Sequence, residues 1–162
     1  MKQPPVIFLD FDGVIRMGDG TGPKSFKFIP DKLALIREFT DLVRGRLVVT
    51  STWRELFKLE RILEEMAGAL TLEHFHSSWM TPLLRAQSRC DARDVPRGAE
   101  IITWLHSQPE VPAFVIFDDL PTRDFYPLHD HLVPCDSALG LIPSSIGLAL
   151  RLLGKQGVKH DT

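Results

Sequence analysis

Three short, uninterrupted apolar runs stand out in the pattern of hydrophobic and polar positions along the chain. They span residues 6–9, 47–49 and 113–117, and acidic or hydroxyl side chains follow each run directly. A strand inside a parallel sheet is buried on both faces, so a continuous apolar run of this length is typical of such a strand. Leu132 and Val133 predict one further short strand.

Between and after these runs, apolar residues recur at helical spacing. The spacing predicts helices over residues 30–44, 53–67, 98–107 and 143–153. Pro30 and Thr52 suit the starts of the first two helices, because proline favours the first turn and a hydroxyl can cap it. Gly45 and Gly68 suit the positions just beyond their ends.

Residues 69–96 show no clear periodicity, although Thr81 and Pro82 predict the start of a short helix. The alternation of strands and helices elsewhere predicts an α/β fold, with a doubly wound, mainly parallel sheet sandwiched by helices. We expect one domain over residues 1–162. The glycine-rich segment 17–25 predicts a short flap, and no stretch has room for a large cap domain.

Composition and charge narrow the functional classes. At 162 residues, 44% of them hydrophobic and 25% charged, the chain can bury one core. The net charge of −2 argues against a protein that coats a polyanion, since such proteins carry a basic excess. No apolar stretch approaches the roughly 20 residues of a membrane span. Cys90 and Cys135 are far apart and form no CxxC motif. We therefore expect a cytoplasmic protein with reduced thiols and no membrane contact.

Four carboxylates follow two of the predicted strands. Asp10 and Asp12 come after the first run, and Asp118 and Asp119 come after the run 113–117. The carboxyl ends of parallel strands meet at one edge of a sheet, so these acids should lie close together. The hydroxyl groups of Thr50 and Ser51, which follow the run 47–49, should lie at the same edge. Clustered carboxylates repel one another unless a hard cation neutralises them, and oxygen ligands suit Mg²⁺. The sequence therefore predicts a magnesium site at this edge.

Four segments, in order, resemble the motifs of the haloacid dehalogenase (HAD) superfamily. FLDFDGV resembles the first motif, Thr50 in LVVTS the second, Arg97 in PRGAEII the basic third, and the acid pair at 118 and 119 the fourth. The resemblance spans nearly the whole chain. More narrowly, TSTWR, WMTP, RGAEIITWL, IFDD and LGL resemble the HAD domain of Swiss Army Knife RNA repair proteins.

This resemblance implies a magnesium-dependent phosphomonoester hydrolase with an aspartyl-phosphate intermediate. Asp10 would be the nucleophile, and Asp12 would act as acid and base toward the leaving group and water. The implied magnesium ligands are Asp10, Asp12, Asp118 and Asp119, where Asp12 could contribute its backbone carbonyl.

The resemblance also implies a phosphate-binding group. Thr50 would donate a hydrogen bond to a phosphoryl oxygen, with Ser51 beside it, although hydroxyls here could instead cap the following helix. Arg97 would offset negative charge in the transition state, and Arg54, next to the second motif, competes for that role.

The sequence leaves the phosphorylated substrate open. A site without a large cap can accept a nucleic-acid end or another accessible phosphate. The alternatives are a small-molecule or nucleotide phosphatase and a non-catalytic phosphate-sensing module. Arg85, Arg89 and Arg93 recur every four residues, but acidic residues intervene, which favours a solvated face over nucleic-acid binding.

Overall fold

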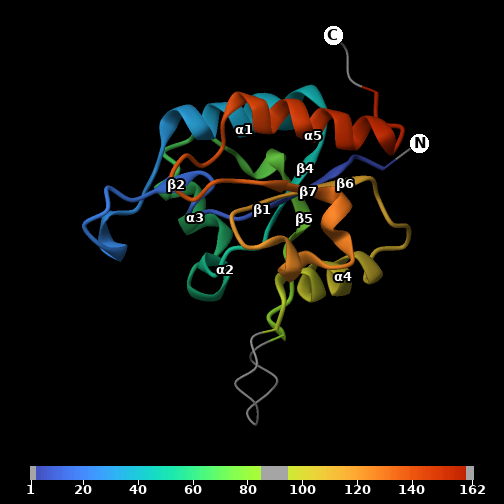
Figure 1. Cartoon of the computed structure of the whole chain (residues 1–162), viewed down its shortest axis with the longest axis horizontal. Helices are drawn as coiled ribbons and strands as arrows, with labels where there is room; N and C mark the ends of the chain where they lie inside the picture. The colour runs from blue at the N-terminus through green and yellow to red at the C-terminus, as the bar shows by residue number, and fades with distance from the viewer. Residues whose placement is uncertain (1–2, 85–94, 160–162) are drawn as a thin grey trace.

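Five parallel strands form the central sheet, in the order β5-β4-β1-β6-β7 (Figure 1). The computed structural model describes residues 3–84 and 95–159. The strands are β1 (Val6–Leu9), β4 (Arg46–Val49), β5 (Phe75–Met80), β6 (Phe114–Asp118) and β7 (Leu132–Pro134). The chain adds strands outward from β1 in both directions, which confirms the doubly wound arrangement predicted from the sequence.

The central strands bury both of their faces. In β1, Ile7 and Leu9 belong to one hydrophobic core, whereas Val6 and Phe8 belong to another on the opposite face. This division follows from the alternation of side chains along a strand. Burial on both faces explains why the apolar runs in the sequence are uninterrupted.

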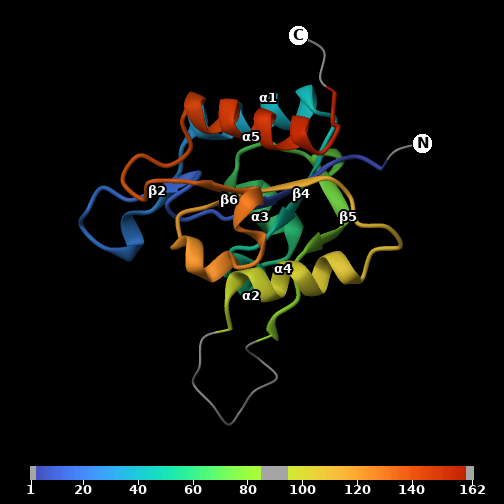
Figure 2. The same ribbon diagram turned by 45° about the vertical axis from the view of Figure 1, so that its right-hand side comes forward.

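Helices cover the two faces of the sheet. α1 (Pro30–Leu42) and α5 (Pro143–Lys155) lie side by side on one face, and α4 (Arg97–His106) covers the other (Figures 1 and 2). Trp104 of α4 packs edge-on against Phe8 of β1, with 5.3 Å between the ring centroids. Over residues 3–84 and 95–159, no helix is both long and apolar enough to cross a bilayer.

The helix predicted over residues 53–67 is instead two short helices, α2 (Trp53–Leu56) and α3 (Leu59–Glu65). Phe57 between them has an extended backbone (φ −132°, ψ 142°), and its ring lies 4.9 Å from the ring of Trp53, centroid to centroid. The prediction was wrong because the apolar spacing continues across the break.

Strand β5 could not be predicted because Ser77 and Ser78 interrupt its apolar positions. It lies at an edge of the sheet, where partly solvated side chains are tolerated. Thr81 follows β5 directly, and its amide donates a hydrogen bond to the Val49 carbonyl at 3.1 Å. The short helix predicted to start at Thr81 and Pro82 would continue over residues 85–94, which lie outside the described residues. Cys90 and the three arginines Arg85, Arg89 and Arg93 lie outside the described residues.

The glycine-rich segment 17–25, predicted as a short flap, lies within a longer hairpin of residues 16–28, here called the flap. Its two arms, β2 (Arg16–Met17) and β3 (Lys27–Phe28), pair as an antiparallel hairpin. The flap projects away from the sheet beyond the carboxyl end of β1 (Figure 1).

Candidate active site

Backbone hydrogen bonds hold the strand-end residues in register beyond the strands themselves. The Asp10 amide donates to the Phe117 carbonyl at 3.0 Å, and the Thr50 amide donates to the Leu9 carbonyl at 3.0 Å. Asp118 is the last residue of β6. The two acids and the threonine are therefore placed by the rigid sheet.

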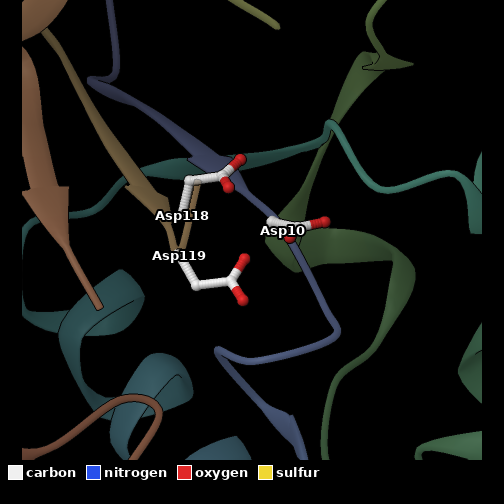
Figure 3. Close-up of side chains that lie close together, drawn as sticks. All are labelled: Asp10, Asp118 and Asp119. Atoms are coloured by element: carbon white, nitrogen blue, oxygen red, sulfur yellow. The ribbon is translucent and has the colours of Figure 1, made fainter. Parts of the chain in front are cut away.

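Three of the four carboxylates that the sequence predicts to meet do gather at this edge. Asp10, Asp118 and Asp119 each offer an oxygen, and these atoms lie within 4.8 Å of one another (Figure 3). Burial, followed by the charge of Asp10, raises the pKa of Asp118 to about 8 and that of Asp119 to about 6. Burial also raises the pKa of Asp10, against the lowering effect of Arg97.

The chemistry of this cluster suits a hard cation. Among the residues that the structure describes, the buried Oδ2 atom of Asp118 has no hydrogen-bond partner. Burial raises the pKa of all three acids, so their ionised forms are disfavoured without a further positive charge. A divalent cation with oxygen preference, such as Mg²⁺, would satisfy the orphaned oxygen and offset the charges.

Arg97 is the positive group nearest to the cluster among the described contacts. Its Nη1 atom donates to the Thr50 carbonyl at 2.6 Å and to Asp10 Oδ1 at 3.3 Å, and it lies 3.5 Å from Asp118 Oδ2. The side chain is only 9% exposed. Burial lowers the pKa of Arg97, but the carboxylates of Asp10 and Asp118 outweigh this effect and raise it.

The hydroxyl groups after β4 differ from each other. Thr50 is fully buried, and its Oγ1 atom has no hydrogen-bond partner within residues 3–84 and 95–159. Ser51 Oγ accepts a long hydrogen bond from the Trp53 amide at 3.4 Å, so Ser51, rather than Thr52, contacts the start of α2. A buried orphan hydroxyl is costly unless a ligand engages it, which favours Thr50 as the ligand-binding group.

Asp12 lies apart from the three clustered acids. Its carboxylate pairs with Arg16, whose guanidinium also donates to the Phe26 carbonyl at 2.7 Å and lies 4.3 Å from the Trp53 ring centroid. The Asp12 carboxylate is not part of the group formed by Asp10, Asp118 and Asp119, and a magnesium contact through the Asp12 backbone carbonyl stays a prediction. Sequence reasoning missed Arg16, because nothing in its spacing indicates which acid it meets.

Gly13 explains the glycine of the DFDG motif. Its backbone has a φ of +80°, and a Cβ atom added there would lie 2.1 Å from Asp119 Oδ2. Only glycine allows the turn after β1 to pack this closely on the carboxylate of Asp119.

A cleft of about 650 Å³ is lined in part by Asp12, and this volume is typical of small-molecule sites. It lies between the flap and residues 137–138, and Asp12 is the one charged residue among the described residues that line it. The other lining residues are Met17, Gly18, Gly20, Gly22, Phe26, Ser137 and Ala138.

Arg54, the second candidate for phosphate binding, is paired with Glu100 and makes no described contact with the carboxylate cluster. Its side chain is 2% exposed and pairs with Glu100, with 2.6 Å between Nη2 and Oε2. Its remaining described hydrogen bonds go to backbone carbonyls. Of the two arginines, only Arg97 contacts the carboxylate cluster.

A doubly wound parallel sheet with an aspartate after β1, an aspartate pair at the end of β6, a hydroxyl after β4 and a basic residue at the start of α4 defines a protein of the HAD type. The chain belongs to the family described as the HAD domain in Swiss Army Knife RNA repair proteins, whose model matches residues 6–146. The family confirms the resemblance and places the chain among phosphoester hydrolases. Comparisons with curated proteins and with solved structures give no match.

Proposed function

We propose that the chain is a magnesium-dependent phosphomonoesterase that forms an aspartyl phosphate on Asp10. The observation that carries this proposal is the convergence of Asp10, the Arg97 guanidinium and the orphan hydroxyl of Thr50 at one edge of the sheet. These are a nucleophile, a positive charge and a hydrogen-bond donor, the groups that phosphoryl transfer requires.

Two displacements on phosphorus account for hydrolysis. In the first, an oxygen of Asp10 bonds to phosphorus as the bond to the ester oxygen breaks, and Asp12 donates a proton to the departing oxygen. In the second, Asp12 removes a proton from water, whose oxygen bonds to phosphorus. The aspartyl–phosphate bond then breaks, which releases orthophosphate and frees Asp10.

Asp12 suits the acid and base role through its position. Arg16 binds its Oδ1 atom, and the side chain is 46% exposed beside the cleft under the flap. A leaving group in that cleft would lie next to the carboxylate.

Asp10, Asp118 and Asp119 would hold the magnesium ion, and the Asp12 carbonyl is a further candidate ligand from the resemblance. When bound, the ion supplies positive charge that offsets the carboxylates and the phosphate. Arg97 and Thr50 would orient the phosphoryl oxygens, with Ser51 beside them.

The family description supports a phosphorylated nucleic-acid end as the substrate, since it refers to RNA repair. The second candidate is a small-molecule or nucleotide phosphatase. The cleft beside Asp12 favours it, because its volume lies within the range of small-molecule sites.

Phosphate release from a panel of esters tests the proposal. The panel comprises an aryl phosphate, nucleoside monophosphates, and oligonucleotides phosphorylated at the 5′ or the 3′ end, with magnesium or with EDTA. We expect release that requires magnesium and is lost in Asp10→Asn. Orthophosphate binding without any turnover would instead indicate a phosphate-sensing module.

A further inference from the structure

Arg54 is buried behind the proposed phosphate site and connects three segments of the chain. Its Nε atom donates to the Thr81 carbonyl at 3.1 Å, beyond the end of β5. Its Nη1 atom donates to the carbonyls of Thr50 and Ser51, the latter at 2.8 Å. One guanidinium therefore holds together the residues that follow β4 and β5.

Glu100 completes the arrangement from α4. Its carboxylate binds Arg54 Nη2 at 2.6 Å and also accepts a hydrogen bond from the Leu84 amide at 3.4 Å. The side chains of Arg54 and Glu100 are 2% and 5% exposed. Glu100 lies three residues after Arg97 on α4, so both side chains leave the same face of the helix.

The two arginines meet at a single acceptor. The Thr50 carbonyl receives hydrogen bonds from Arg54 Nη1 and from Arg97 Nη1, the latter at 2.6 Å. Two guanidinium groups this close repel each other, and the Glu100 carboxylate offsets that repulsion from the buried side.

We infer that the Arg54–Glu100 pair is a positioning device, which sets Thr50 and the start of α4 so that Arg97 meets the phosphate. This inference rests on the proposed function. Neither member of the pair contacts the carboxylate cluster in the described contacts. Both act through Thr50 and Arg97, so their removal should misplace the phosphate-binding groups without removing any of them.

A purely structural role for the pair makes a different prediction. Replacing a buried ion pair with apolar side chains of similar size is often neutral for stability, whereas removing one partner leaves an unpaired buried charge. The double variant Arg54→Met with Glu100→Leu therefore separates folding from positioning. Arg61→Met is the matched control, because Arg61 pairs with Glu64 and Glu65 on the exposed surface of α3.

The experiment measures the thermal midpoint, the affinity for inorganic phosphate in the presence of magnesium, and kcat and KM for an aryl phosphate. Each single variant should lower the midpoint, and the double variant should recover it. The double variant should still lose about 100-fold in kcat/KM, as expected for reactive groups displaced by about 1 Å, and should bind inorganic phosphate more weakly. Arg61→Met should match the wild type. Recovery of both midpoint and activity in the double variant would overturn the inference.

A second variant keeps the test decisive if the double variant does not fold. Arg54→Lys retains the buried charge but loses the planar fork that binds several acceptors. It should weaken inorganic phosphate binding in the wild-type background and have no further effect in an Arg97→Ala background. Equal effects in both backgrounds would show that Arg54 does not act through Arg97.

The phosphate-affinity measurement keeps the inference separate from the proposed function. If the wild type binds inorganic phosphate but releases none from esters, the phosphatase proposal is contradicted. The phosphate affinities of the double variant and of Arg54→Lys then still test the positioning role. A wild type that neither binds inorganic phosphate nor hydrolyses esters overturns both.

Discussion

At the scale of single residues, Gly13 shows how closely the turn after β1 packs on the acid cluster. Gly13→Ala places an L side chain at a φ of +80° and a Cβ atom 2.1 Å from Asp119 Oδ2. We expect the free energy of unfolding to fall by about 1–3 kcal/mol from backbone strain. The displaced carboxylate of Asp119 should also raise the magnesium concentration needed for half-maximal activity.

Gly20 in the flap provides the matched control. Its φ is +87°, but a Cβ atom there would meet no atom of the described residues within 4 Å. Gly20→Ala should therefore show comparable strain in chemical denaturation and an unchanged magnesium requirement. Equal magnesium requirements in the two variants would contradict the role given to the Gly13 contact.

The two acids of the DFDG motif should fail in different ways. Asp10→Asn removes the nucleophile, so rapid-quench assays with an activated aryl phosphate should show neither a burst nor turnover. Asp12→Asn should retain a burst, because an activated leaving group needs little protonation, and then turn over slowly, because water attack lacks its base. A burst in Asp10→Asn, or full turnover in Asp12→Asn, would refute this assignment.

Residues placed by the sheet could be predicted from the sequence, whereas side-chain partners could not. Asp10, Asp118 and Thr50 follow apolar runs, and strand ends in a parallel sheet converge for geometric reasons. The partners of Asp12 and Arg54 are Arg16 and Glu100. Those contacts depend on the path of the flap and on the placement of α4, neither of which leaves a local pattern in the sequence.

At the scale of elements, the flap is attached to α2 through Trp53. The Arg16 guanidinium lies 4.3 Å from the centroid of the Trp53 ring, and the Phe28 ring centroid lies 5.4 Å from it. Trp53→Ala removes both contacts. We expect flap amides to exchange with deuterium about tenfold faster, which corresponds to the loss of roughly 1–2 kcal/mol of cation–π and aromatic packing.

Trp104→Ala is the control for this prediction. Trp104 packs on Phe8 and donates a hydrogen bond from Nε1 to the Ser78 carbonyl at 2.9 Å, on the α4 side of the sheet. It should increase exchange in β5 and α4 more than in the flap. If both variants accelerated flap exchange equally, the change would reflect general destabilisation and the proposed attachment through Trp53 would be wrong.

The same elements show where periodicity stops being informative. Apolar spacing located α1, α4 and α5 within about two residues. It missed the break at Phe57, because the apolar positions stay in phase on both sides of an extended residue. It also missed β5, because an edge strand does not need apolar residues on both faces.

At the scale of the whole molecule, the acid cluster makes folding stability depend on pH in an unusual direction. An unfolded aspartate has a pKa of about 3.9, whereas burial raises the pKa to about 8 for Asp118 and about 6 for Asp119 in the folded chain. Between these values the folded chain binds more protons than the unfolded chain. The contribution of the two acids to stability therefore falls as pH rises from about 4 to about 8.

Thermal unfolding at pH 5 and pH 8, in EDTA and in magnesium, tests this linkage. Asp118→Asn cannot ionise at residue 118, so in EDTA the thermal midpoint of the wild type should fall below that of the variant as pH rises. Magnesium binds the ionised carboxylates and should stabilise the wild type more at pH 8 than at pH 5, because fewer protons then compete with it. Asp130→Asn, at a side chain that is 87% exposed, should follow the wild type under all four conditions. The thermal midpoints of the wild type and Asp118→Asn could instead differ by the same amount at both pH values. That result would show that the Asp118 carboxyl of the folded chain does not retain its proton. The electrostatic argument for a cation at this edge would then lose its basis.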